Sequence, residues 1–158
     1  MGLLLMTAGC GSLRQMAATF CKSDHADPEI ASLMQSSCEG NHRSSLSLGL
    51  RYEKGQGVPL DPARARQYYK RAATPRSGTT YIYVPAAGKV AGYTMPINTG
   101  PDLPGLAEAQ YRLALMYQRG LGGKRNQRKA RKWLERAARQ GHPAASAMLA
   151  ELETLNDS

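Results

Sequence analysis

A segment near the middle of this chain is repeated 65 residues later. Residues 45–73 align without a gap on residues 110–138. The identical positions are Leu48/Leu113, Leu50/Leu115, Tyr52/Tyr117, Gly55/Gly120, Gly57/Gly122, Ala65/Ala130, Arg66/Arg131, Arg71/Arg136, Ala72/Ala137 and Ala73/Ala138. A second offset, of 36, places Ala109, Leu113 and Ala114 over Ala145, Leu149 and Ala150. Because 36 is close to the period of about 34 that marks stacked helical hairpins, the pattern predicts a helical repeat array with one insertion.

Each copy of the repeat predicts two helices. In the first copy, a leucine-rich segment that includes Tyr52 stops at Gly55 and Gly57, and glycine relieves the left-handed backbone that a helix end often adopts. Asp61 and Pro62 then predict a second helix, because the carboxylate caps free amide hydrogens and proline needs none at the first helical position. The apolar stripe on that helix is formed by Ala65, Tyr68, Tyr69, Ala72 and Ala73.

The second copy has the same order of signals. A helix is expected before Gly120 and Gly122, and Asn126 is the predicted cap of the next helix. The stripe on that helix is formed by Ala130, Trp133, Leu134, Ala137 and Ala138. Tyr68 and Trp133 occupy equivalent positions, so both side chains are expected to be buried between hairpins, where the alanines allow close helix approach.

The spacing of these residues resembles the Sel-one-like repeat family, which is tetratricopeptide-like. The first matching pattern consists of Leu48, Gly49, Tyr52, Gly55, Gly57, Val58, Asp61, Ala65, Tyr68, Ala72 and Ala73. The second consists of Leu113, Ala114, Tyr117, Gly120, Gly122, Asn126, Ala130, Trp133, Ala137, Ala138 and Gly141. Gly123 departs from the family, which usually has valine there. The resemblance implies an all-α, short right-handed solenoid of antiparallel helical hairpins that acts as an adaptor or scaffold and has no catalytic residues.

The repeats divide the chain into six segments. Because repeat arrays need about three units to stabilise one another, the ends of this two-repeat chain are expected to act as caps. The segments are a leader (1–10), an N-terminal strap and capping helix (11–39), repeat 1 (40–73), an insertion loop (74–106), repeat 2 (107–141) and a C-terminal capping helix that is a partial third repeat (142–158).

The insertion is the part of the chain that the repeat does not explain. Residues 79–84 are rich in β-branched and aromatic side chains, and residues 90–97 have the composition of a return strand, so a β-hairpin-like loop is predicted. In one interpretation the hairpin projects, and Tyr81, Tyr83 and Tyr93 contact a partner. In the other, it is a flap that packs over the groove of the solenoid and covers apolar surface that two repeats leave open. The sequence is compatible with both.

Positive charge is concentrated in the second repeat. Residues 107–141 hold ten lysines and arginines against two glutamates, a net charge of +8 out of +9 for the whole chain. The densest part is the basic surface formed by Lys124, Arg125, Arg128, Lys129, Arg131 and Lys132. Such a cluster attracts phosphates or other anions. The core spacing of Ala130, Trp133 and Leu134 favours the simpler explanation that the cluster is the solvated face of a helix. If the protein is exported, anionic lipid headgroups or an acidic partner surface are better targets than nucleic acid.

The first ten residues resemble the end of a bacterial lipoprotein signal. A short apolar run from Gly2 ends in small residues directly before Cys10. The resemblance implies that Cys10 is lipidated, which anchors the protein in the periplasm, and Gly11 implies the outer membrane. No lysine or arginine precedes Cys10, whereas export signals carry a basic start. The alternative is an accidental match in a cytoplasmic protein.

Two cysteines remain if Cys10 is lipidated. Cys21 and Cys38 then make an even number in an oxidising compartment and are candidates for a disulfide; the alternative is two thiols. If residues 12–22 and 28–38 formed a helical hairpin, the two would lie about 15 Å apart, beyond the span of about 7 Å that a disulfide allows. Pairing therefore requires residues 11–24 to be a non-helical strap.

No motif in the chain predicts catalysis, a cofactor or a metal site. His25, His42 and His142 are the three histidines, and none has the spacing of a zinc site or a nucleophile–base pair. The sequence therefore favours an adaptor that binds a protein or peptide partner on its solenoid groove and insertion loop, at the bacterial cell envelope. The alternative is a basic module that binds nucleic acid or an anionic surface through the cluster at residues 124–132.

Overall fold

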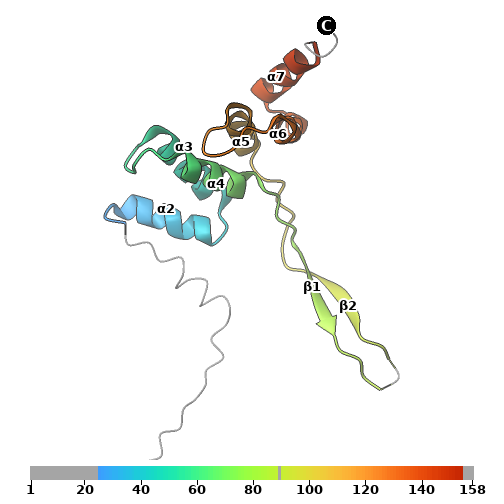
Figure 1. Cartoon of the computed structure of the whole chain (residues 1–158). Helices are drawn as coiled ribbons and strands as arrows, with labels where there is room; N and C mark the ends of the chain where they lie inside the picture. Colours follow the sequence, from blue (N-terminus) through green and yellow to red (C-terminus); the bar gives the residue numbers. More distant parts are fainter. Residues whose placement is uncertain (1–24, 89, 155–158) are drawn as a thin grey trace, which may run out of the picture.

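The computed structural model describes residues 25–88 and 90–154, and in them helices follow one another as stacked antiparallel hairpins (Figure 1). Each helix packs against the next one along the chain. The helices are α2 (Pro28–Cys38), α3 (His42–Lys54), α4 (Pro62–Ala73), α5 (Ala107–Arg119), α6 (Gln127–Arg139) and α7 (Pro143–Thr154). The predicted solenoid of helical hairpins with an inserted hairpin is confirmed, and the fold is mostly helical rather than all-α because the insertion contains two paired strands.

The helix ends form where the sequence predicts them. The Asp61 carboxylate accepts hydrogen bonds from the backbone amides of Ala63 and Arg64 at the start of α4, and Asn126 caps α6 in the same way. Gly55 (φ 68°) and Gly120 (φ 76°) end α3 and α5 in the left-handed conformation that glycine adopts without steric cost. These caps hold the two repeats in the same register.

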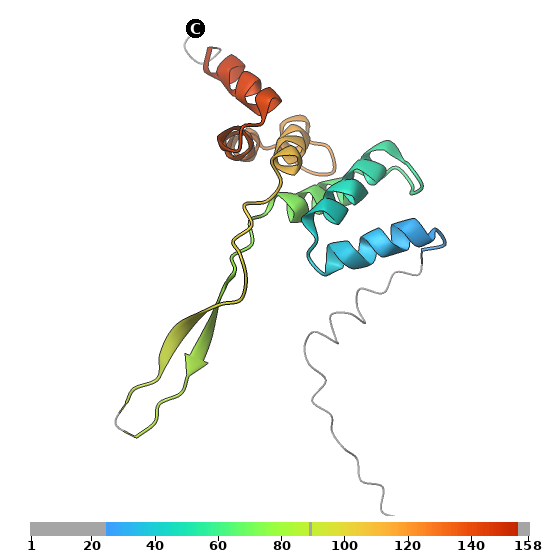
Figure 2. The ribbon, with the colours of Figure 1, turned by 180° about the vertical axis from the view of Figure 1, so that it is seen from behind.

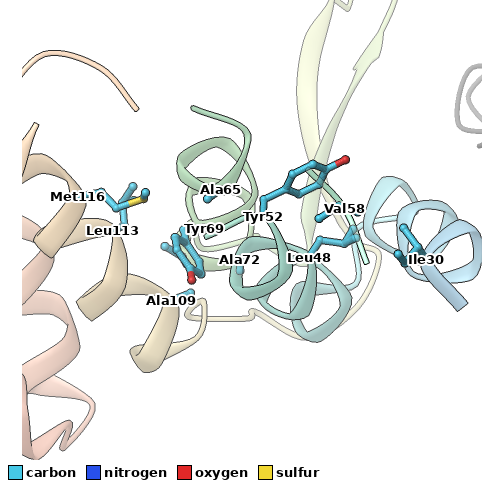
Figure 3. Close-up of a cluster of buried hydrophobic side chains, with 11 residues drawn as sticks. Ile30, Leu48, Tyr52, Val58, Ala65, Tyr69, Ala72, Ala109, Leu113 and Met116 are labelled. Atoms are coloured by element: carbon cyan, nitrogen blue, oxygen red, sulfur yellow. The ribbon is translucent and has the colours of Figure 1, made fainter. Parts of the chain in front are cut away.

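The core runs through the array as two adjoining clusters, of which Figure 3 shows the larger. The larger cluster joins α2 to α5, and Ile30 of α2 is fully buried in it. Its members are Ile30, Leu48, Tyr52, Val58, Ala65, Tyr69, Ala72, Ala73, Ala109, Leu113 and Met116. The smaller cluster joins α5, α6 and α7 and consists of Ala114, Leu134, Ala137 and Ala145. Both repeats therefore contribute to a continuous apolar interior.

The expected burial of Tyr68 and Trp133 is confirmed only in part: both pack against the core, and Trp133 contacts both clusters, but neither side chain is fully buried. Both side chains are only half-buried, whereas their neighbours Tyr69 and Leu134 are 0% and 1% exposed. One residue along a helix turns the side chain by about 100°, so the pattern identified the right stripe but placed its centre one position too early. Tyr68 stacks on Tyr52 at the edge of the core, with 5.5 Å between ring centroids.

The two repeats fill the same position differently. In repeat 1, the Tyr69 ring lies directly over Gly49, where an added Cβ would come within 2.5 Å of the ring. In repeat 2, Ala114 and Leu134 occupy the equivalent places and are both buried. A large residue thus faces glycine and a smaller one faces alanine, which keeps the spacing of the helices similar in both hairpins.

The insertion is a two-stranded antiparallel ribbon that extends away from the helices (Figures 1 and 2). Strand β1 (Thr79–Val84) pairs with β2 (Tyr93–Asn98), with Thr79 opposite Asn98 and Val84 opposite Tyr93. Every residue of β1 and β2 is exposed except Val84, which is half-buried. The interpretation of the insertion as a flap over the groove is therefore wrong. The physical reason is that the helices already cover their own apolar faces, with α2 and α7 closing the two ends.

Polar contacts fix the base of the ribbon to the helical array. Arg76 and Leu103 exchange two backbone hydrogen bonds of 2.8 Å, and the Gly78 amide donates to the Asp102 carboxylate at 2.7 Å. The buried Gln110 side chain of α5 donates to the backbone carbonyls of Ala73 and Pro104, which precede and follow the two strands of the ribbon. The ribbon therefore leaves the array from a hydrogen-bonded base.

Several expectations lie outside the described residues. These are the leader at residues 1–10, lipidation of Cys10, the strap at residues 11–24 and the position of Cys21. Cys38, at the end of α2, is disulfide-bonded, and its pairing with Cys21 stays a prediction. Of the helices in the described ranges, none is long and apolar enough to cross a membrane.

Candidate functional site

The hairpin separates the three predicted contact tyrosines onto two faces. Side chains alternate along a strand, so Tyr81 and Tyr83 point to one face, and Tyr93, which pairs with Val84, points to the other. All three are well exposed, at 70%, 67% and 51%. The Tyr83 hydroxyl end lies against the backbone at Gly92, where a Cβ would approach within 2.3 Å. The structure thus brings Tyr81 and Tyr83 together and places Tyr93 apart from them.

The second face of the hairpin is the more apolar one, and the sequence analysis did not identify it. Tyr93 shares this face with aliphatic and thioether side chains from both strands, and most of them are at least one-third exposed. The apolar residues of this face are Ile82, Val84, Tyr93, Met95 and Ile97, and Thr80 lies beside them opposite Ile97. The signal that could have found this face is strand geometry, because residues two apart in a strand, such as Ile82 and Val84, lie on the same face.

Two further properties make the hairpin a candidate contact surface. Between Arg76 and Asp102 the sequence has one charged residue, Lys89. The two strands pair only with each other in the part of the chain that the structure describes, so both outer edges have backbone groups without a strand partner. Native proteins commonly protect such edges with charges or cover them with other elements. Here the exposed edges combine with apolar faces.

The basic surface lies on the solvent side of α6 and the loop before it. The cations of this run are all exposed, while Ala130, Leu134 and Ala137 of the same helix are buried, as the apolar stripe predicts. Two arginines elsewhere in the chain have carboxylate partners across helices: Arg51 pairs with Glu29, and Arg112 pairs with Glu53 as well as with Glu108 of its own helix. In the basic surface, the one carboxylate pairing among described residues is Arg131 with Glu135, at 3.4 Å.

Repeat 1 contributes a cation to this surface that the linear sequence did not predict. The Arg66 guanidinium lies over the Tyr117 ring, 3.9 Å from its centroid, and donates to the backbone carbonyl of Lys124 at 3.2 Å. The Lys129 ammonium lies over the same ring at 5.5 Å. The tertiary structure therefore joins α4 and α6 into one cationic surface that spans both repeats.

A cleft of about 610 Å³ lies beside the base of the hairpin and is also cationic. It opens between the turn before α3 and the end of α4, and His42, Lys70, Arg71 and Arg76 line it. Burial and the nearby Arg76 guanidinium hold the pKa of His42 below its usual value. Arg76 donates to the Gly40 carbonyl at 3.0 Å, which ties the hairpin base to the α2–α3 turn.

The buried titratable groups form contacts between repeats rather than a reactive centre. The Tyr69 hydroxyl and Arg112 both donate to Glu53, and burial raises the pKa of Tyr69 far above its usual value. Burial alone would raise the pKa of Glu108, but hydrogen bonds from His142 and Arg112 hold it below its usual value. Within the described residues, no group of three or more His, Cys, Asp or Glu is arranged to hold a metal ion.

Comparison with protein families gives one match. The Sel1 repeat family is matched at residues 43–74 and again at residues 107–142. These two stretches overlap nearly all of the two repeats derived above, and the hairpin lies between them. The matched helices are α3 with α4 and α5 with α6.

Two curated relatives have the same printed description, "Exopolysaccharide production negative regulator". The protein from Rhizobium meliloti (strain 1021) is 31% identical, and the similarity covers 78% of this chain and 54% of the relative. The protein from Rhizobium leguminosarum bv. viciae is 30% identical, covering 72% of this chain and 51% of the relative. The chain thus spans about half the length of these relatives.

Two solved structures share the arrangement of helices. The crystal structure of a Sel1 repeat protein from Oxalobacter formigenes superposes with a TM-score of 0.56 at 28% identity, covering 76% of this chain and 26% of the other. A protective antigen of uropathogenic Escherichia coli strains that displays an SLR fold gives 0.51 at 30% identity, covering 72% and 18%. Both likenesses extend over most of the helical array.

Proposed function

This chain is a Sel1 repeat protein related to proteins named as negative regulators of exopolysaccharide production, and on that premise we propose that it is a regulatory adaptor. It binds a protein partner through the projecting hairpin and thereby restrains exopolysaccharide production. Its family is generally non-enzymatic, so regulation proceeds through binding rather than catalysis.

The observation that carries this proposal is the exposed, nearly uncharged hairpin. A two-stranded ribbon is marginally stable in water by itself, and soluble proteins rarely leave a contiguous apolar surface uncovered unless it binds something. Ile82, Met95 and Ile97 are each more than one-third exposed, and Tyr81 and Tyr83 about two-thirds. A partner that covers both faces would bury this apolar area and pair with the open strand edges.

The helical array acts as the support of the hairpin. Gln110 and the Arg76–Leu103 pair hold the base of the ribbon against α4 and α5. Because the fixed base already orients the ribbon, the ribbon loses less conformational entropy when the partner binds. The groove of the array is a second contact region for the same partner.

The proposed location is the cell envelope. Lipidation of Cys10 would attach the protein to a membrane, the outer membrane by the resemblance of its leader, and disulfides persist mainly in oxidising compartments. The disulfide at Cys38 agrees with such a compartment. Incorporation of labelled palmitate into the full-length protein, compared with Cys10→Ala, tests the anchor; equal incorporation would place the protein elsewhere.

The test of function removes the hairpin and leaves its base. Residues 79–98 are replaced by a short Gly-Ser turn between Gly78 and Thr99, so that the Arg76–Leu103 pair and the Asp102 contact remain. In a strain that lacks this chain, wild type should lower exopolysaccharide output and the shortened protein should not, although its helical circular dichroism and melting temperature are unchanged. Full repression by the folded, shortened protein would refute the adaptor proposal.

Photo-crosslinking identifies the partner and its point of contact. A photoreactive amino acid at Tyr83 should capture one protein in cells, and the same amino acid at the exposed Gln67 of α4 is the matched control. Capture that is equal at both positions would show that the contact is not made by the hairpin.

A further inference from the structure

We propose that the cationic surface formed by both repeats binds an acidic polysaccharide, a chain that carries carboxylates along its length. This surface is defined by Arg66, Lys124, Arg125, Arg128, Lys129 and Lys132. The proposal goes beyond the protein adaptor, because it shares no residue with the hairpin and requires no protein partner. If the adaptor function also holds, the same molecule would contact the polymer whose production it restrains.

The first observation is uncompensated charge. Lys124, Arg125, Arg128, Lys129 and Lys132 are exposed, and none of them has a carboxylate partner among the described residues. Carboxylates pair with Arg51 of α3 and with Arg112 of α5. Because these five cations have no carboxylate partner among the described residues, an external polyanion would release condensed counterions and gain affinity without breaking an ion pair.

The second observation is the shape of the surface. Arg125, Asn126, Gln127, Arg128, Lys129 and Lys132 surround a polar hollow of about 570 Å³. Anionic groups of a flexible chain can approach the cations from within this open hollow, whereas a bilayer is flat on this scale and contacts its rim. The guanidinium groups of Arg125 and Arg128 also match a carboxylate in shape, since two parallel hydrogen bonds can form. Shape therefore favours a linear carboxylated polymer over a membrane.

The third observation concerns the aromatic rings beside these cations. The Tyr117 ring lies beneath Arg66 and Lys129, and Arg136 lies over the Trp133 ring at 4.6 Å. Proteins that bind single-stranded nucleic acid stack bases on open aromatic faces. Here the ring faces are used to hold cations in place, so the surface offers fixed positive charge without a platform for bases. This favours a polyanion that has no bases.

The test compares polymers of matched length. Binding of fluorescent oligogalacturonate is measured by anisotropy at several salt concentrations, with neutral dextran, oligo-dT and phosphatidylglycerol vesicles as alternative ligands. Wild type should bind oligogalacturonate and not dextran, and the affinity should fall steeply as salt increases. The slope of log affinity against log salt reports how many cations take part.

The variant carries five substitutions, Lys124→Gln, Arg125→Gln, Arg128→Gln, Lys129→Gln and Lys132→Gln. It should bind oligogalacturonate at least about tenfold more weakly at low salt, with a salt slope reduced by roughly three to five. The control removes the same number of exposed cations elsewhere, through Arg43→Gln, Lys54→Gln, Lys70→Gln, Arg119→Gln and Arg139→Gln. Because all ten positions are exposed, both proteins should retain their circular dichroism and melting temperature.

The outcomes separate the alternatives. An equal loss in the control would mean that net charge, not this surface, attracts the polymer, and the proposal would be wrong. Tighter binding of oligo-dT or of phosphatidylglycerol vesicles than of oligogalacturonate would assign the surface to nucleic acid or to membrane instead. The hairpin replacement should leave oligogalacturonate binding unchanged, so failure here is distinguishable from failure of the adaptor function.

Discussion

The helical array and the hairpin use apolar residues for opposite purposes. In the array, Tyr69 and Leu48 are fully buried, and close helix contacts are made by alanine and glycine. In the hairpin, Tyr81 and Ile82 remain exposed on a ribbon with its edges open. The difference shows that residue type alone does not tell a core from a binding surface. Stability should depend on the first region and recognition on the second.

The largest effect should come from truncating a tyrosine in the array. Tyr69→Ala removes a ring that is 0% exposed and its hydrogen bond to Glu53. Loss of a large core side chain costs about 3–5 kcal/mol, so thermal unfolding should occur about 10 °C lower or more. On the hairpin, Tyr81→Ala should change the free energy of unfolding by no more than about 0.5 kcal/mol. Equal melting temperatures for the two variants would remove the contrast between the regions.

A smaller effect should follow from adding one methyl group at two glycines that each face a tyrosine. In Gly49→Ala, the new Cβ would lie 2.5 Å from the buried Tyr69 ring. The overpacking should lower the free energy of unfolding by about 1–3 kcal/mol. This loss exceeds the gain from the higher helix propensity of alanine relative to glycine. In Gly92→Ala, the new Cβ meets the Tyr83 hydroxyl at 2.3 Å. Tyr83 is exposed and can swing away, so chemical denaturation should detect almost no change.

A double substitution tests the reason for the first of these effects. Gly49→Ala combined with Tyr69→Leu recreates in repeat 1 the pairing of Ala114 with Leu134 in repeat 2. The double variant should be more stable than the sum of the two single changes predicts. Strict additivity would mean that the two residues do not share one packing site.

The smallest effect should be that of acid on the array. The pKa of His42 is lowered by burial and by Arg76, so the unfolded chain binds this proton more readily than the folded chain does. Stability should therefore fall as the pH drops below about 6.5. The melting temperature should fall by no more than about 2 °C, because His42 is only partly buried. His42→Gln should lack this fall.

Glu108 acts in the same direction at lower pH. Its pKa is held down in the folded protein by His142 and Arg112, so the stability that it provides is present above its unfolded pKa of about 4.3 and is lost as the pH falls through the lower folded value. Circular dichroism melting curves from neutral to acid pH measure both steps. The hairpin has no titratable carboxylate, so its deletion should leave this profile unchanged.

Local signals allowed most of the fold to be predicted. Asp61 and Asn126 cap helices where expected, and Gly55 and Gly120 end them, because caps depend on residues that are close in sequence. The strand pattern of residues 79–84 is also local. The sequence placed Tyr68 at the centre of the buried stripe, whereas Tyr69 is the fully buried ring. A helix turns by about 100° per residue, so two adjacent tyrosines do not show which ring faces inward.

The candidate site was predictable only in its parts. In one of the two interpretations of the sequence, Tyr81, Tyr83 and Tyr93 contact a partner; the structure shows that all three are exposed, and the strand register decides that Tyr93 lies on the other face. The cluster at residues 124–132 was visible as a run of charge, whereas Arg66 joins it across 58 positions of sequence through its contact with Lys124. Contacts of that separation leave no periodic signal in a single chain.

The sequence by itself determined the repeat, the helix boundaries, the presence of a hairpin and the excess of positive charge, because each of these depends on the order of neighbouring residues. Only the tertiary structure decided that the hairpin projects instead of covering the array, and that cations from two repeats form one surface. The physical reason is that burial and charge compensation depend on which surfaces the other helices already cover. In this chain, α2 and α7 close the ends of the array, and the two strands of the hairpin extend away from the helices.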